Sequence, residues 1–229
     1  MKQYQIIYAD PPWRYKENWG NGTNEHTYKT MRFEEIRSLP IKDIVSDEAH
    51  LYLWVTNPFL SEGLEICKAW GFDYKTLLTW IKTYTDGSPE MGMGYYFRSC
   101  TEHIIFGTRG KMKVRNKITK NMFFAVNPRW LGRSHSAKPD EVRQWIVDWS
   151  GDLPRIELFA RTKVDGWDCW GNEVEGDIEL QAPTNHLYSQ PPSSQGIRCG
   201  IPSTPYQSGL LQIRYYVSRI PRAIEVYCR

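Results

Sequence analysis

The segment Asp10-Pro11-Pro12-Trp13 combines a carboxylate, two prolines and an aromatic ring within four residues. Each proline fixes one backbone φ angle, so the loop that carries the carboxylate is stiff. The Asp10 carboxylate and the Pro11 carbonyl oxygen could accept the two N–H bonds of one amine, while the Trp13 ring could stack on a planar base. An ordinary turn can have the same Asp-Pro-Pro composition, and this alternative stays open on the segment alone.

The exocyclic amine of adenine is a group that needs such a site. Its lone pair is conjugated into the ring, so two acceptors must hold the nitrogen in a more tetrahedral state before it attacks. A base in nucleic acid must also leave the stack, which costs a few kcal/mol. Stacking on Trp13 would offset part of that cost, by roughly 1–3 kcal/mol. In that role Asp10, Pro11, Pro12 and Trp13 would form a catalytic segment, with Trp13 also holding the substrate base, and the rest of the chain has to decide between this role and an ordinary turn.

Apolar runs that alternate with helical patterns predict the elements around this segment. We expect strands at 5–9, 50–55, 74–82, 101–107 and 155–159, and helices at 33–38, at 57–71 with Asn57 as N-cap, and after Pro139. This alternation predicts an α/β fold with a parallel-rich sheet covered on both faces. Ligands bind such sheets beyond the carboxyl ends of the strands. Asp10 and residues 157–161 both follow strands, so we expect them at one edge.

A run of six cations separates two of the later elements. It consists of Arg109, Lys111, Lys113, Arg115, Lys117 and Lys120. We hypothesise that Lys111, Lys113 and Arg115 bind phosphates of the strand next to the flipped base, without reading its sequence. The alternative is a solvated, charged hairpin.

The composition of the chain indicates an ordinary globular protein and argues against several other classes of protein. The chain has 229 residues, of which 41% are hydrophobic and 24% charged, as in ordinary globular proteins. We expect one domain at 1–180 and a Pro/Ser/Gln-rich extension at 181–229, poorly ordered or appended. The five cysteines are scattered, which argues against disulfides and a metal site. The first apolar run is too short for a signal peptide or a membrane span, so we expect a cytoplasmic protein.

The chain resembles the adenine methyltransferase family named for the seventy-kilodalton AdoMet-binding subunit of the eukaryotic messenger-RNA enzyme, which also has small bacterial and phage members. The resemblance covers residues 6–173, and the motifs occur together in a fixed order. They are Ala9–Trp13, Tyr28–Met31, Leu51–Thr56, Trp70–Phe72, Trp80–Thr83, Glu102-His103, Ser136–Glu141, Ile156–Arg161, Gly166-Trp167 and Gly171-Asn172.

The resemblance implies a Rossmann-like class I methyltransferase fold with permuted motif order (β-class), and S-adenosylmethionine as the cofactor. It also implies the roles of individual residues. Lys138 would pair with the cofactor carboxylate, Arg161 and Asn172 would hold its ribose with Glu173 nearby, Asp10 would also face its amine, Glu157 would be a further contact, and Tyr28 would lie by the substrate pocket.

The resemblance further implies a site-specific adenine-N6 methyltransferase that acts on nucleic acid. We favour DNA over RNA, because the chain is short. An RNA adenine methyltransferase and a non-catalytic nucleic-acid-binding partner subunit remain alternatives. The intact Asp10 segment, Lys138 and Asn172 favour an active enzyme. Family members often pair, so a homodimer or a paired subunit is expected, with no membrane partner.

Overall fold

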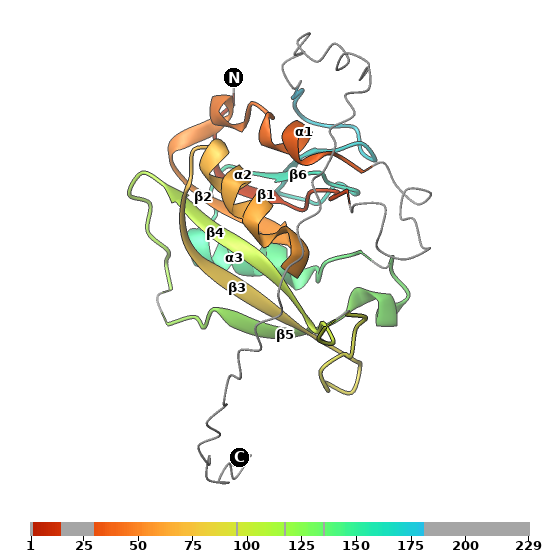
Figure 1. Ribbon diagram of the computed structural model, residues 1–229. Helices are drawn as coiled ribbons and strands as arrows, with labels where there is room; N and C mark the ends of the chain where they lie inside the picture. Colours follow the sequence, from red (N-terminus) through yellow and green to blue (C-terminus); the bar gives the residue numbers. More distant parts are fainter. Residues whose placement is uncertain (1, 15–29, 95, 117, 135, 181–229) are drawn as a thin grey trace, which may run out of the picture. The chain divides into compact units, whose positions relative to one another are not determined.

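Seven strands form one sheet in the order β5-β3-β4-β2-β1-β6-β7 (Figure 1). This computed structural model describes residues 2–14, 30–94, 96–116, 118–134 and 136–180. The strands are β1 (Tyr4–Ala9), β2 (Val45–Val55), β3 (Asp73–Thr83), β4 (Thr101–Arg109), β5 (Met122–Val126), β6 (Arg155–Leu158) and β7 (Asp168–Trp170). The predicted α/β class is confirmed.

The central position of β1 follows from its sequence. Five of its six residues are buried, and only Gln5 is partly exposed. A strand that is apolar on both faces needs strands on both sides and cover above and below. β1 pairs in parallel with β2 on one side and with β6 on the other, so the carboxyl ends of the three strands meet at one edge.

Helices cover both faces of the sheet (Figure 1). The helices α1 (Phe33–Arg37) and α2 (Leu60–Ala69) pack on one face, and α3 (Glu141–Ser150) packs on the other. Short 3-10 turns occur at η2 (Ile41–Asp43), η3 (Asn57–Phe59) and η4 (Pro128–Leu131). The prediction that Asn57 caps α2 is wrong. Thr56 precedes the 3-10 turn, and the Asn57 side chain instead binds Thr101 and His103 on β4.

One strand runs against the others, and this changes where the cationic run lies. β4 is antiparallel to both β2 and β3. Its first residues therefore lie at the edge that carries Asp10, and its last residue, Arg109, pairs with Ala49 at the opposite edge. At roughly 3.4 Å per residue, β4 separates the two edges by about 27 Å. The predicted position of Lys111, Lys113 and Arg115 beside the catalytic segment is therefore wrong.

Two short strands were not predicted, because little in their sequences marks them. β5 is the last strand of the sheet on its side, and its Met122 and Phe124 side chains are 40% and 57% exposed. β7 has only three residues. The predicted extension at 181–229 lies outside the described residues, so its boundary stays a prediction. None of the described helices combines the length and apolar character needed to cross a membrane.

The contact between α2 and the sheet gives a test of this packing. A Cβ atom added at Gly63 would lie against the Val55 side chain and 2.7 Å from Cδ1 of Ile105. We expect Gly63→Ala to lower the free energy of unfolding by about 1–2 kcal/mol, because overpacking outweighs the gain in helix propensity. Urea unfolding monitored by circular dichroism would measure it. Glu65→Ala, on the exposed face of α2, should stay within about 0.5 kcal/mol of wild type, and an equal loss there would contradict this packing.

Candidate active site

Charged side chains from four segments meet at the carboxyl edge of β1. The Lys138 ammonium lies 2.9 Å from Oδ2 of Asp10 and 3.5 Å from Oε2 of Glu102. Glu102 also pairs with Lys82, whose Nζ lies 2.5 Å from Oε1. Glu102 reaches this edge because β4 begins there. The result is a chain of alternating charges, Lys82-Glu102-Lys138-Asp10.

Burial and pairing set the charges in this chain. Burial raises the pKa of Asp10, and the Lys138 ammonium acts against that rise without cancelling it. Burial alone would also raise the pKa of Glu102, but the ammonium groups of Lys138 and Lys82 hold that pKa below its usual value. Burial disfavours a charged Lys138, and the carboxylates of Asp10 and Glu102 more than offset this, so its pKa is raised. Among these groups, Asp10 is the carboxylate whose proton affinity is increased.

The loop after Asp10 is fixed by its own backbone and by a buried ring. The backbone N–H of Trp13 donates a hydrogen bond to the Pro11 carbonyl oxygen at 2.9 Å. The Trp13 ring stacks on Phe59 with centroids 5.1 Å apart, and its indole N–H donates to the carbonyl of Trp54 at 3.3 Å. Only 7% of Trp13 is exposed. In this structure Trp13 therefore anchors the loop, and stacking of the substrate base on its ring stays a prediction.

A cavity of about 290 Å³ opens beside Asp10. Four of the residues predicted to contact a cofactor line it, namely Asp10, Lys138, Glu157 and Arg161. The wall thus carries both acids and bases, so a ligand with an ammonium and a carboxylate group would find partners for each. The other lining residues are Tyr8, Arg133, Ser134, Ser136, Ala137, Asp140, Arg143, Phe159 and Thr162.

Glu157 is held by a partner that the sequence analysis did not single out. Both of its carboxylate oxygens accept hydrogen bonds from Arg143 on α3, each at 2.7 Å. Glu157 is 7% exposed, so this bidentate pair is largely desolvated. A cofactor contact by Glu157 would have to share the carboxylate with Arg143. No local signal marks Arg143, because the pair depends on how α3 lies over β6.

Phe159 adopts a backbone conformation that is unusual for its residue type. It follows β6 and lines the cavity with φ at 62°, and no other described residue apart from glycine has a positive φ. Such a conformation costs of order 1–3 kcal/mol and is often found at functional sites. Surrounding contacts hold it in place. The Phe159 ring meets Trp170 edge-on at 5.3 Å, and the next N–H, of Ala160, donates to the carbonyl of Trp170.

The residues after β7 approach the same edge. Gly171 lies so close to Ala160 that an added Cβ would be 2.8 Å from the Ala160 nitrogen, and only glycine fits. This approach places Glu173 beside Arg161, with Oε1 3.8 Å from Nε. Asn172, between Gly171 and Glu173 in the chain, is exposed and does not line the cavity.

One part of the predicted site lies outside the described residues and another lies elsewhere in the fold. Tyr28 belongs to the part that is not described, so its place by the substrate pocket stays a prediction. Lys111, Lys113 and Arg115 lie at the other end of β4. The edge therefore holds the candidate catalytic and cofactor residues, and the cationic run is separate from it.

The profile of the MT-A70 family matches residues 4–173 of the chain. The Type II methyltransferase M.MunI of Mycoplasma sp is 32% identical over 206 residues, which is 80% of this chain and 82% of that protein. The probable N(6)-adenosine-methyltransferase MT-A70-like of Oryza sativa subsp. japonica is 30% identical over 84% of this chain and 27% of its own length.

The human N(6)-adenosine-methyltransferase catalytic subunit METTL3 is 28% identical over 80% of this chain and 30% of its own length. The chain thus spans most of M.MunI and less than a third of these two eukaryotic relatives. These matches confirm the resemblance that the motifs indicated.

The pair between α3 and β6 gives a test of the site's framework. Arg143→Met should lower the free energy of unfolding by about 3–5 kcal/mol, because it leaves the Glu157 carboxylate buried without its partner. Adding Glu157→Gln to that variant should recover part of the loss. Thermal and urea unfolding would measure both effects. Arg155→Met, which breaks the more exposed pair with Asp152, is the matched control, and an equal loss there would show that Glu157 is not the cause.

Proposed function

The chain belongs to the MT-A70 family, and from this we propose that it transfers a methyl group from S-adenosylmethionine to the exocyclic amine of adenine in nucleic acid. One observation carries the proposal. The carboxylate of the Asp10 segment lies at the mouth of a cavity with charged groups of both signs, and its Oδ1 makes no hydrogen bond within the described part of the chain. That oxygen is available to an amine.

The cavity residues fit the proposed cofactor. S-adenosylmethionine supplies an electrophilic methyl group, and its methionine end carries one ammonium and one carboxylate. Lys138 would pair with that carboxylate, and Asp10 would face the ammonium. Arg161, which lines the cavity, and Glu173, which pairs with it, would hold the ribose, and Phe159 would supply an apolar wall. Asn172 and Glu157 remain proposed contacts, the latter shared with Arg143.

The protein's part in the reaction is to hold and deprotonate the amine. One N–H of the amine would donate to Oδ1 of Asp10, and the other to the Pro11 carbonyl, which has a second lone pair besides the one used by Trp13. After attack, the nitrogen must lose one proton, and the Asp10 carboxylate is the acceptor in place. Its raised pKa favours that transfer. Trp13 holds the loop, and its stacking on the base remains part of the proposal.

We favour DNA as the substrate over RNA. The match to the Type II methyltransferase M.MunI covers most of both proteins, whereas the match to the N(6)-adenosine-methyltransferases covers less than a third of the length of those proteins.

Action in the cytoplasm and pairing with a second subunit remain part of the proposal. The three described cysteines are free, which fits a reducing compartment.

Asp10→Asn tests the proposal most directly. We expect transfer of a labelled methyl group from S-adenosylmethionine to adenine-containing DNA to fall at least about 100-fold, because the amide cannot take the proton and is a weaker acceptor. Asp73→Asn, an exposed acid at the start of β3, should keep full activity.

The acceptor separates the remaining alternatives. Transfer to RNA alone would keep the mechanism and reject the preference for DNA. Binding of nucleic acid with no transfer by the wild type to either acceptor would instead support a non-catalytic partner subunit.

The pH dependence of transfer tests the ionisation of Asp10. Asp10 must be ionised to act, and its pKa is raised, so the rate at saturating cofactor should fall on acidification at a higher pH than for an ordinary aspartate. Lys138 lowers that pKa, so Lys138→Met should move the acid limb of the rate to still higher pH. Lys163→Met, at an exposed pair with Asp177, should leave it in place. An acid limb that is the same in all three proteins would show that Asp10 does not control it.

A further inference from the structure

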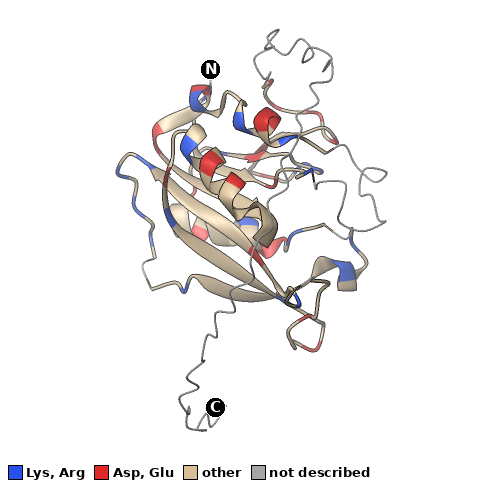
Figure 2. Ribbon diagram, in the orientation of Figure 1, with Lys and Arg blue, Asp and Glu red and all other residues tan. Residues whose placement is uncertain are grey.

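The cationic run leaves β4 at the edge opposite Asp10 and is not used by the proposed chemistry. Figure 2 shows basic but no acidic residues along the described part of this segment. From His103 to Pro139 the sequence contains no aspartate or glutamate. Lys111, Lys113 and Lys120 are exposed and make no ion pair within the described part of the chain. We define residues 109–116 and 118–120 as the cationic strap.

The strap is fixed to the body of the protein. Exposed Lys111, Lys113 and Arg115 alternate with the partly buried Met112 and Val114. The Met112 carbonyl accepts a hydrogen bond from the buried His50 ring at 3.2 Å, and the Arg115 N–H donates to the carbonyl of Trp149 at 2.7 Å.

His50 is itself held in place. Its Nδ1 lies 2.7 Å from the Ser150 hydroxyl, which also contacts Tyr52 at 2.8 Å. Burial lowers the pKa of His50, so the ring stays neutral and keeps both hydrogen bonds. The strap therefore presents its cations from a fixed backbone.

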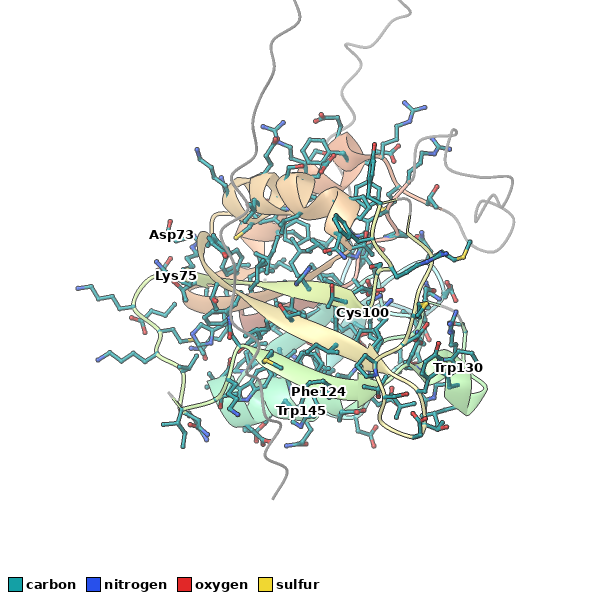
Figure 3. The ribbon with its side chains drawn as sticks, turned by 60° about the horizontal axis from the view of Figure 1, so that its bottom comes forward. Asp73, Lys75, Cys100, Phe124, Trp130 and Trp145 are labelled. Carbon is teal, nitrogen blue, oxygen red and sulfur yellow. The ribbon has the colours of Figure 1, made fainter. Side chains whose placement is uncertain are left out.

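An aromatic groove adjoins the strap. Its volume is about 330 Å³, and its lining includes Lys120 from the strap, Phe123 from β5, and Trp145 and Trp149 from α3. Figure 3 shows Trp145 beside β5 and Trp130 further along, on the segment that follows β5. The groove is thus lined by rings and has one of the unpaired cations at its rim.

We propose that the cationic strap, which begins at the edge opposite Asp10, and the aromatic groove between β5 and α3 form a second nucleic-acid-binding surface outside the Asp10 cavity, which takes a single strand. The cations would bind its phosphates, and unstacked bases would lie against Trp145 and Trp149. Cations beside aromatic faces are the combination by which proteins bind single strands without sequence preference. A duplex keeps its bases stacked inside and could use only the cations.

The choice of partner rests on the proposed function, in which nucleic acid is the substrate. The surface itself does not take part in the reaction. It raises the affinity for the substrate strand and makes that affinity depend on salt, while the rate of transfer at saturation stays as the Asp10 edge sets it.

Oligothymidine is the probe that separates this surface from the active site, because it contains no adenine. Fluorescence anisotropy of a labelled oligothymidine with the full chain would give Kd at several salt concentrations. For single strands the slope of log K against log salt is about −0.7 per phosphate contact. The triple variant Lys111→Gln, Lys113→Gln, Arg115→Gln should therefore bind more weakly, with a slope shallower by about 2. Neutralising Arg37, Lys68 and Lys75, which are exposed on other elements, should change neither quantity.

Trp145→Leu separates the groove from the strap. It should weaken binding at every salt concentration by about 5-fold or more and leave the slope unchanged, because stacking carries no charge. Unchanged circular dichroism and unchanged methyl transfer would show that Trp145→Leu folds. If Trp145→Leu fails to fold, the triple variant of the strap alone tests the proposal.

Three results would overturn the inference: an unchanged slope in the triple variant, an equal loss in the control, or tighter binding of a G·C duplex than of oligothymidine. A wild type that binds oligothymidine through the strap but transfers no methyl group would keep this inference and reject the proposed function.

Discussion

Two carboxylates and two ammonium groups share one partly buried edge of the sheet, and most of the structure serves to place them. In surroundings of low polarity each charge needs an opposite neighbour, because an unpaired buried charge costs several kcal/mol. Asp10 is placed by β1, Lys138 by the segment before α3, and Lys82 by the end of β3. Glu102 joins these charges because β4 enters the sheet in the reverse direction. If β4 were parallel, Lys138 would lack its second carboxylate, so the reversed strand is a requirement of the charge chain.

At the same edge, a rigid backbone carries an Asp10 carboxylate oxygen that can accept a hydrogen bond. The Asp10 loop is fixed by two prolines, by the hydrogen bond from Trp13 to Pro11 and by the packing of Trp13 on Phe59. The opposite wall is fixed by Phe159 and by the close approach of Gly171. One carboxylate oxygen of Asp10 is tied to Lys138. The other is held in position by the same constraints, which is the preorganisation that electrostatic catalysis requires.

Local sequence predicted the parts of the fold that local forces determine. The apolar runs located β1, β2, β3, β4 and β6, and the Asp-Pro-Pro-Trp segment located the loop whose Asp10 lines the cavity. The direction of β4 could not be predicted, since an apolar strand reads the same either way, and this misplaced Lys111, Lys113 and Arg115. The pairing of Arg143 with Glu157 and the burial of Trp13 also depend on tertiary packing, which no short window of sequence contains. The positive φ of Phe159 has no residue-type signal, because such conformations are usually taken by glycine.

The reversal of β4 also separates two parts of the protein that could otherwise constrain each other. A rigid strand joins the Asp10 edge to the cationic strap, and the pairs that set the register of β4 with β2 and β3 end at Arg109, before the lysines of the strap. During divergence, the strap can therefore vary as an independent module while the residues around Asp10 stay fixed. Under the proposed function, such variation would adapt the protein to different nucleic acids without changing the residues around Asp10.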